Sequence, residues 1–379
     1  MADNAARQPA FVAPIAHGAS GTQARLHNTQ LPVHLLDHSL ASLTEALAAR
    51  GHSKFRAAQV WRWALAQRAT SFAAMNNVSL KLRAELGEQY SLARPRIDEV
   101  DASTDGTRKY RFVADDDTAF EAVFIPEVAR GRGTNTLCIS SQTGCAVGCK
   151  FCFTASLRRN RNLRPSEIVG QVLAVQDDLE AAGIAERVTN IVFMGMGEPL
   201  LNYDNVVQSV HMLIDPAGCD FSSRRITIST SGIVKNLERL GHDVPTQLAI
   251  SLNATTDEVR TRIMPINKTW PLARLLEAMR NYPLRGRRRI TVEYVLLGGV
   301  NDSEEDARRL TQLLRGIPVK LNLLPLNAHE RTDLLPPQPA AVLRFQKIVL
   351  DAGYVAFVRT PRGQDIAAAC GQLGESAKR

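Results

Sequence analysis

The stretch CAVGCKFC, residues 145–152, places three cysteines at Cys-x3-Cys-x2-Cys spacing directly after an apolar segment that is expected to form a strand. Three thiolates at this spacing can ligate three irons of a four-iron cluster and leave the fourth iron open to a substrate. A closed zinc site would need a further Cys or His pair, and none of the eight histidines lies near the run. Iron–sulfur chemistry at Cys145, Cys149 and Cys152 is therefore favoured over zinc binding or simple burial.

Outward from this run, short apolar segments alternate with amphipathic ones. The pattern predicts strands at 136–140, 189–194, 225–230, 247–252, 290–297 and 319–324, and helices near 166–182, 204–214, 233–240, 271–281 and 303–315. Six β/α units imply a parallel sheet, so we predict an α/β fold, a partial TIM-like (β/α)6 barrel over 136–360, rather than a flat doubly wound sheet. Ligands should gather at the C-terminal ends of its strands.

The rest of the chain divides into smaller regions. Residues 1–30 lack an apolar period, which predicts a disordered or loosely docked tail. Helical periodicity after Ser39 and Ser53 and near Ser79 predicts a small N-terminal helical domain over 31–95. Alternation around the turn dipeptide Asp105-Gly106 predicts a β-hairpin extension and linker over 96–135. A short C-terminal segment, 361–379, carries Cys370.

Composition narrows the class of protein. With 379 residues and 45% hydrophobic content, the chain can bury a large core, which excludes disorder throughout. No window resembles a membrane span, and the six cysteines are too unevenly placed for a disulfide framework, so we expect a cytoplasmic protein without membrane association. The 46 Lys and Arg outnumber the 38 Asp and Glu, and the net charge of +8 favours an acidic partner such as nucleic acid.

The cysteine run, with the aromatic Phe151 before its last cysteine, resembles the signature of radical S-adenosylmethionine (SAM) enzymes. Eight further stretches resemble the RlmN/Cfr family of radical SAM adenosine RNA methyltransferases, and RlmN proteins more than Cfr proteins. They are FRAAQV (55–60), VFIPE (123–127), LCISSQ (137–142), RNLR (161–164), MGMGEPL (194–200), STSG (229–232), MPIN (264–267) and ACGQL (369–373). Because they span about residues 35–374 in the family's order, they are far more specific than the cysteines alone.

The resemblance implies a radical SAM barrel that holds a 4Fe-4S cluster on Cys145, Cys149 and Cys152. It implies two SAM molecules per turnover, one as methyl donor and one as radical source. The expected SAM-binding residues are Gly197, Glu198, Ser229, Ser251, Leu252, Asn253 and Asn327. Asn253 stands where RlmN proteins often carry His, which favours a backbone contact there. The loop 327–331 departs from the family's pattern, and this departure leaves the choice of substrate open.

The resemblance also implies roles for three catalytic residues. Cys370 takes a methyl group from SAM as S-methylcysteine, and a radical made on that methyl group adds to adenosine C2 in a covalent enzyme–RNA adduct. Glu121 matches the proton acceptor, and Cys138 matches the thiolate that releases the product with a transient disulfide. Taken alone, Glu121 could be an ordinary hairpin charge, Cys138 an inert buried thiol and Cys370 a structural cysteine. A methyl-carrying residue is needed because an adenine ring carbon is not nucleophilic enough to displace the SAM methyl group directly.

We therefore predict an enzyme that forms 2-methyladenosine in 23S ribosomal RNA, with tRNA as a further candidate substrate. The alternatives are a C8-adenosine methyltransferase of Cfr type and a non-catalytic iron–sulfur RNA-binding protein. A monomer served by a reductant protein such as flavodoxin or ferredoxin is expected. Three groups of basic residues are expected to supply RNA contacts: Arg158, Arg159, Arg161 and Arg164; Arg285, Arg287, Arg288 and Arg289; and Lys54, Arg56, Arg62, Lys81 and Arg83. Trp61 and Trp63 lie in the same region of the sequence as the third group.

Overall fold

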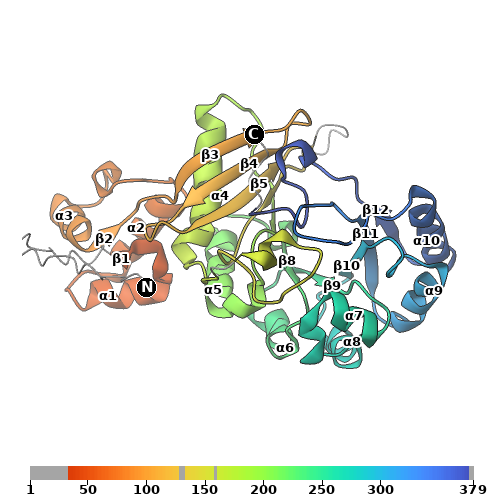
Figure 1. The fold of residues 1–379 in the computed structure, drawn as a ribbon. Helices are drawn as coiled ribbons and strands as arrows, with labels where there is room; N and C mark the ends of the chain where they lie inside the picture. Colours follow the sequence, from red (N-terminus) through yellow and green to blue (C-terminus); the bar gives the residue numbers. More distant parts are fainter. Residues whose placement is uncertain (1–32, 128–132, 158–159, 375–379) are drawn as a thin grey trace, which may run out of the picture. The chain divides into compact units, whose positions relative to one another are not determined.

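A computed structural model of the chain describes residues 33–127, 133–157 and 160–374. The predicted tail at 1–30, with Arg158 and Arg159, lies outside these described residues. From Val33 onward the chain forms one compact unit (Figure 1). None of the helices in the described chain is long and apolar enough to cross a membrane.

One ten-stranded sheet organises the structure, and its strands follow one another in chain order (Figure 1). They are β3 (Arg96–Ala102), β4 (Arg108–Val113), β5 (Ala119–Ile125), β6 (Thr136–Cys138), β7 (Asn190–Phe193), β8 (Ile226–Thr230), β9 (Gln247–Ser251), β10 (Ile290–Leu296), β11 (Val319–Pro325) and β12 (Ala356–Val358). Strands β6 to β12 pair in parallel, which confirms the α/β barrel-like fold. The parallel part has one strand more than predicted, β12. It was not predicted because a strand of only three residues has too short a sequence pattern to detect. Within the described chain β12 does not pair with β3, so the sheet stays open.

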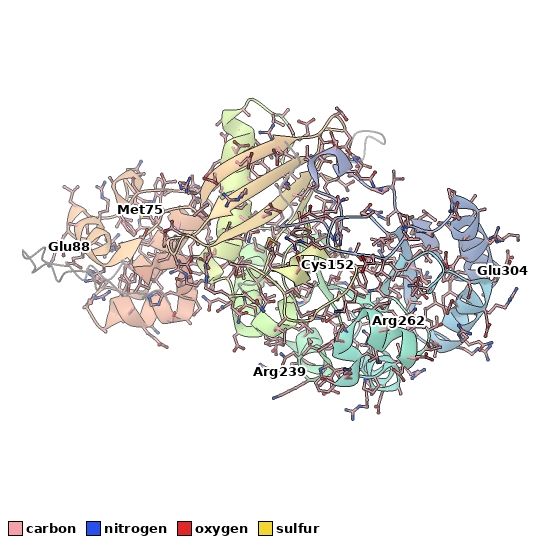
Figure 2. The ribbon with its side chains drawn as sticks, in the orientation of Figure 1. Met75, Glu88, Cys152, Arg239, Arg262 and Glu304 are labelled. Atoms are coloured by element: carbon pink, nitrogen blue, oxygen red, sulfur yellow. The ribbon has the colours of Figure 1, made fainter. Side chains whose placement is uncertain are left out.

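Helices connect the parallel strands. The long ones are α4 (Pro165–Ala181), α5 (Tyr203–Ile214), α6 (Val234–Asp243), α8 (Leu272–Asn281), α9 (Glu304–Leu313) and α10 (Pro339–Asp351), with the shorter α7 (Asp257–Ile263) before α8. Short 3-10 helices are η1 (Leu35–Asp37), η2 (Phe72–Ala74), η3 (Phe153–Ser156), η4 (Pro199–Asn202), η5 (Ser223–Arg225), η6 (Pro265–Lys268) and η7 (Gln364–Ile366). Fully buried apolar side chains of the strands form the core, and charged side chains such as Glu304 and Arg239 point outward (Figure 2).

The predicted hairpin is a three-stranded meander. Strands β3 and β4 meet at the predicted Asp105-Gly106 turn, where Gly106 has a φ of +83°. A second turn at 114–118 then leads into β5, because the run of three aspartates at 115–117 cannot continue a strand. Strand β5 pairs with β6, so the meander continues the barrel sheet rather than forming a separate extension.

The N-terminal helices are α1 (Leu40–Ala48), α2 (Lys54–Leu65) and α3 (Leu80–Gln89), and the short strands β1 (Val33–His34) and β2 (Tyr90–Ser91) pair beside them. The Ser39 hydroxyl caps α1 by accepting a hydrogen bond from the Ser42 amide at 3.1 Å. Trp61 is 2% exposed, and its indole N–H donates to Asp215 at 3.0 Å. Trp61 therefore packs in the core of the helical region, and the domain boundaries stay predictions.

Candidate active site

The C-terminal ends of β7 to β11 and the loop after β6 surround a cavity of about 180 Å³. Parallel strands present their carboxyl ends at one edge, so residues distant in sequence meet there. Most of the predicted site residues line this cavity: Cys145, Cys149, Cys152, Gly197, Glu198, Ser229, Ser251, Asn253, Asn327 and Cys370. Leu252, Glu121 and Cys138 are not among the lining residues; Leu252 is fully buried and presents its carbonyl to Arg260 instead.

The three cysteines of the CAVGCKFC loop are free thiols at the wall of this cavity. Burial raises the pKa of Cys145 to about 12 and also raises the pKa of Cys149 and Cys152. Across the described residues, no three His, Cys, Asp or Glu side chains are placed to hold a single metal ion. Three thiols that share one cavity are a donor set that fits an iron–sulfur cluster, in which each thiolate takes a different iron.

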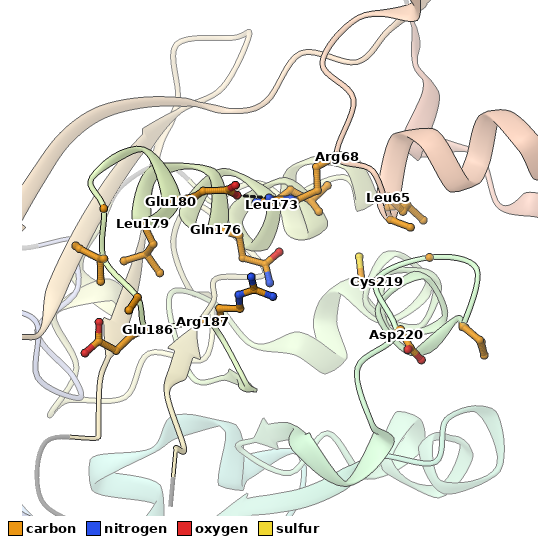
Figure 3. Close-up of a pocket in the computed structure, with 16 residues that line it drawn as sticks. Leu65, Arg68, Leu173, Gln176, Leu179, Glu180, Glu186, Arg187, Cys219 and Asp220 are labelled. Atoms are coloured by element: carbon orange, nitrogen blue, oxygen red, sulfur yellow. Dashed lines mark hydrogen bonds and ion pairs between the residues drawn. The ribbon is translucent and has the colours of Figure 1, made fainter. Parts of the chain in front are cut away.

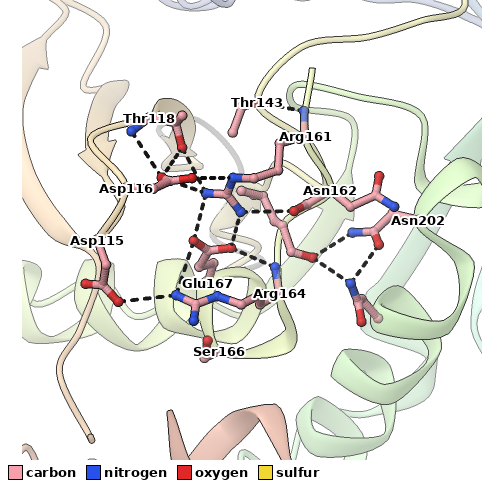
Figure 4. Close-up of polar contacts among 12 residues, drawn as sticks. Asp115, Asp116, Thr118, Thr143, Arg161, Asn162, Arg164, Ser166, Glu167 and Asn202 are labelled. Atoms are coloured by element: carbon pink, nitrogen blue, oxygen red, sulfur yellow. Dashed lines mark hydrogen bonds and ion pairs between the residues drawn. The ribbon is translucent and has the colours of Figure 1, made fainter. Parts of the chain in front are cut away.

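Ion pairs anchor the chain that follows the cysteine loop (Figure 4). The Arg161 guanidinium contacts Asp116 and Glu167, each at 2.9 Å. The Arg164 guanidinium lies 3.3 Å from Asp115 and 3.5 Å from Asp37. Both arginines were expected to contact RNA, which stays a prediction; the structure shows them paired with carboxylates of the meander, of α4 and of the N-terminal region.

A second group of predicted RNA contacts lies away from the cavity. Arg285, Arg287, Arg288 and Arg289 precede β10, so they lie at the N-terminal edge of the parallel strands. Arg288 donates to the Thr246 carbonyl at 3.1 Å, just before β9 begins. Since the cavity is at the opposite, C-terminal edge, this basic group is not part of the candidate site.

The turn after β7 is shaped by Gly197 and Glu198. Gly197 has a φ of +101°, and a Cβ there would lie 2.6 Å from the Cβ of Gln142, so only glycine fits. The Glu198 side chain is 4% exposed and accepts hydrogen bonds from the Ser231 amide and hydroxyl, both at 2.7 Å. Burial raises the pKa of Glu198. Its carboxylate therefore joins the ends of β7 and β8 at the cavity wall.

Asn253 follows β9 in a left-handed conformation with a φ of +58°, which asparagine tolerates. Its side-chain oxygen accepts the Val295 amide at 2.8 Å, and its backbone carbonyl accepts the Asn301 side chain at 2.7 Å. Because the Asn253 side chain is hydrogen-bonded to β10, a contact of Asn253 with a ligand is expected through its backbone.

Cys370 is held at the cavity by hydrogen bonds on both sides of it. The Asn327 side-chain amide donates to the Cys370 carbonyl at 3.0 Å, and the Phe153 amide of the cysteine loop donates to the Gly371 carbonyl at 2.7 Å. The Gly374 amide donates to the Glu121 carboxylate at 2.8 Å. Cys370 is an exposed residue that lines the cavity. Desolvation of its thiol by the surrounding protein, followed by the Glu293 carboxylate, raises its pKa to about 11.

Glu121 and Cys138 lie on the adjacent strands β5 and β6. Val123 pairs with Cys138, so Glu121, two residues from Val123, is on the same face as Cys138. Burial raises the pKa of Glu121 and of Cys138, and Cys370 is the next group that raises the pKa of Cys138. All six cysteines are free, so the transient Cys138–Cys370 disulfide stays a prediction.

Two buried charged residues beside the cavity were not predicted. Glu293 on β10 is 7% exposed, lines the cavity and accepts the Asn322 side-chain amide at 2.9 Å. Arg260 on α7 is fully buried behind the ends of β8 and β9. A single charge inside the apolar segment ITVEYVLL could have pointed to Glu293, whereas nothing in the sequence around Arg260 distinguishes it from a surface arginine.

A larger cavity of about 600 Å³ lies between the end of α2, α4 and the loops at 183–187 and 216–220 (Figure 3). It contains Cys219, to which no role was assigned, and the ion pair between Arg68 and Glu180. None of the predicted catalytic, SAM-binding or cluster residues lines it.

Comparisons with known proteins show the family of the chain. The Radical SAM superfamily matches residues 139–311, and the ribosomal RNA large subunit methyltransferase N-terminal domain matches residues 33–92. Two relatives are named dual-specificity RNA methyltransferase RlmN. The one from Geobacter sulfurreducens is 50% identical to this chain, over 88% of this chain and 90% of the relative. The one from Acidiphilium cryptum is 47% identical, over 89% of this chain and 88% of the relative. The crystal structure of a radical SAM methyltransferase from Sphaerobacter thermophilus superposes with a TM-score of 0.83 at 40% identity, covering 90% of this chain and 99% of that one. The chain therefore belongs to the RlmN family of the radical SAM superfamily.

Proposed function

We propose that this protein is a SAM-dependent RNA methyltransferase that forms 2-methyladenosine in 23S ribosomal RNA and in tRNA. The observation that carries the proposal is the cavity in which the three cysteines, the strand-end polar residues and Cys370 meet. The relatives' name, dual-specificity RNA methyltransferase, supports two classes of RNA substrate. When bound at this cavity, a 4Fe-4S cluster and SAM supply a reducing electron, a 5′-deoxyadenosyl radical and the methyl group.

Cys370 is proposed to carry the methyl group as S-methylcysteine and to deliver its carbon to adenosine C2. Its backbone is fixed by Asn327 and, through Gly371, by the cysteine loop, so its sulfur stays beside the residues expected to hold SAM. A fixed sulfur matters because the reactive carbon must reach one ring position before solvent or protein quenches it.

Glu121 and Cys138 are proposed to complete the reaction. The Glu121 carboxylate accepts the hydrogen of the ring carbon, and its burial keeps its pKa above the ordinary range, closer to neutral pH, where a general base works best. Once the adduct has given its unpaired electron back to an oxidised cluster, the Cys138 thiolate would attack the Cys370 sulfur. The S–C bond to the RNA breaks, its electron pair stays on the carbon, which takes a proton to become the methyl group of the product, and the transient disulfide forms. Both residues lie on the same face of neighbouring strands.

The helical domain at 31–95 is proposed to bind structured RNA. Its exposed cations include Lys54, Arg62 and Lys81, and the net charge of the chain is +8. We also propose that the protein works as a monomer in the cytoplasm and receives electrons from a protein such as flavodoxin or ferredoxin. The barrel at 136–360 and the segment from 361 onward then supply the chemistry.

The test is anaerobic reconstitution with iron, sulfide and methyl-labelled SAM, followed by nucleoside analysis of RNA from a strain that lacks the gene. We expect label in 2-methyladenosine, and none with the Cys370→Ala variant, whose cluster spectrum stays that of the wild type. Label in 8-methyladenosine would mean that the enzyme methylates adenosine at C8 rather than at C2. RNA that stays unlabelled while the protein binds it would favour the non-catalytic alternative.

A further inference from the structure

Arg260 is a fully buried cation that touches the wall of the cavity from behind. Its Nε donates to the Leu252 carbonyl at 3.0 Å, and its Nη2 donates to the Ser231 carbonyl at 2.7 Å and to the Ser251 carbonyl at 3.4 Å. Its Nη1 donates to the Asn267 side chain at 2.9 Å and to the Trp270 carbonyl at 3.3 Å. One planar guanidinium thus fixes the chain after β8, the end of β9 and the turn before α8.

The charge of this guanidinium is not neutralised by contact. None of the ion pairs formed by the described residues includes Arg260, and its hydrogen-bond acceptors are neutral oxygens. Burial lowers its pKa to about 10, which still leaves it positive at neutral pH. The Asp257 carboxylate compensates this charge only indirectly: Asn267 accepts from Arg260 and donates to Asp257 at 2.9 Å, and Asp257 opposes the effect of burial on the Arg260 pKa. A buried cation without a directly contacting carboxylate is costly for folding, so an apolar residue would make a more stable core.

Two other groups of the site, the Glu198 carboxylate and the Cys149 thiol, are coupled to Arg260. Ser231 donates its amide and hydroxyl to the Glu198 carboxylate and accepts Arg260 with its carbonyl, so one residue links the two buried charges. Arg260 and Cys149 also interact electrostatically. Arg260 is therefore hydrogen-bonded to the strand ends expected to hold SAM. Its helix α7 also contacts the cysteine loop, because the Lys150 amide donates to the Ile263 carbonyl at 2.9 Å.

We propose that Arg260 is a positioning residue with two effects: its hydrogen bonds hold the ends of β8 and β9 in the shape that binds SAM, and its charge makes the cluster on Cys149 easier to reduce. Reduction adds negative charge to the cluster, and a nearby cation in a medium of low polarity stabilises that charge. The inference rests on the proposed function only in requiring that the cavity holds a cluster and SAM.

Two substitutions separate the two effects. Arg260→Lys keeps the charge but cannot reach all the acceptors, and Arg260→Met keeps the volume but removes both the charge and the donors. Arg262→Met, at an exposed position of the same helix, is the matched control. The reconstituted full-length proteins are compared by SAM affinity in anaerobic equilibrium dialysis and by cluster midpoint potential in spectroelectrochemical titration.

We expect Arg260→Lys to weaken SAM binding by about tenfold or more, the effect of losing charge-assisted hydrogen bonds, and to keep the wild-type potential. Arg260→Met should weaken SAM binding at least as much and shift the potential to more negative values. Wild-type SAM affinity in Arg260→Lys would overturn the positioning role. This variant tests that role by itself, even if Arg260→Met fails to fold. A wild-type potential in Arg260→Met, or a shifted one in Arg260→Lys, would overturn the effect of charge. If the wild-type protein held no cluster, the proposed function would be refuted instead. Because the wild type is measured beside the variants, this outcome can be told apart from failure of the inference about Arg260.

Discussion

The thiols of Cys138 and Cys370 have surroundings that suit different tasks. Cys370 is exposed to the cavity, while Cys138 is buried in β6 with a pKa raised by burial and by Cys370. A buried thiol of raised pKa is a poor free nucleophile, so it is expected to react only when an electrophilic sulfur partner is brought to it.

We predict that Cys138→Ala lets the RNA adduct form and blocks its release. The protein–RNA crosslink should then accumulate on gels under turnover conditions and should survive denaturation. Cys219→Ala, which removes a half-buried thiol outside the site, serves as the control and should leave no crosslink. Normal turnover by Cys138→Ala would exclude the proposed release step.

The pH dependence should reveal Glu121. Because the proton acceptor must be ionised, the single-turnover rate of methylation should fall as the pH drops through the raised pKa of Glu121. The Lys109 charge lowers that pKa, so Lys109→Met should move the acid limb of the profile to higher pH. Lys235→Met, on the exposed side of α6, is expected to leave the profile unchanged. An acid limb that stays fixed, or moves to lower pH, in Lys109→Met would argue against Glu121.

At the scale of elements, the C-terminal segment connects parts of the site that are distant in sequence. It contacts the cysteine loop through Gly371, the loop after β11 through Asn327, and β5 through Gly374. Gly371 has a φ of +89°, and a Cβ there would lie 3.0 Å from the Phe151 carbonyl oxygen. Alanine at this position would therefore strain the connection at about 1 kcal/mol or more.

Gly371→Ala should speed hydrogen exchange across 363–374 and slow RNA methylation several-fold, while iron content stays at the wild-type level. The matched control is Gly353→Ala, which has a similar φ of +86° but no atom within 4 Å of the added Cβ and lies between α10 and β12. It should carry a comparable backbone strain without loss of activity. Equal loss of activity in both variants would mean that general destabilisation, not the position of Cys370, is responsible.

Much of the fold could be predicted because apolar period and turn residues are local signals. The strands at β7 to β11 and the helices α4, α5, α6, α8 and α9 lie within a few residues of their predicted bounds. Strand β12 was missed because three residues carry no measurable alternation, and the third meander strand because a single turn dipeptide suggested a single hairpin. In the site, the motifs predicted the residues that line the cavity. They could not predict Arg260, Glu293 or the pairing of Arg161 and Arg164, which depend on contacts between distant segments.

At the scale of the whole molecule, two groups of basic residues lie far apart, one in the helical domain and one at the N-terminal edge of the barrel. Lys54 and Lys81 are exposed and Arg56 is half-buried at the starts of α2 and α3, while Arg285, Arg287 and Arg289 are exposed at the N-terminal edge of the sheet. If the domain binds phosphates, each lost contact should reduce the salt dependence of binding in proportion.

The triple variant Lys54→Ala, Arg56→Ala and Lys81→Ala should weaken RNA binding and reduce the slope of log affinity against log salt by about 2 to 3. Formation of 5′-deoxyadenosine should not change, because the cavity is untouched. The control triple variant Arg285→Ala, Arg287→Ala and Arg289→Ala removes the same number of charges and should bind RNA as the wild type does. Equal losses in the two variants would mean that net charge, rather than the helical domain, attracts RNA.

The central claim is that Cys145, Cys149 and Cys152 hold a cluster with one iron left for SAM. Its most direct measurement is the yield of 5′-deoxyadenosine from reconstituted, reduced protein kept free of oxygen, with Cys149→Ala as the comparison. We predict SAM cleavage by the wild type and none by Cys149→Ala. A wild-type protein that held zinc instead of iron, or that yielded no 5′-deoxyadenosine under reductant, would contradict the account.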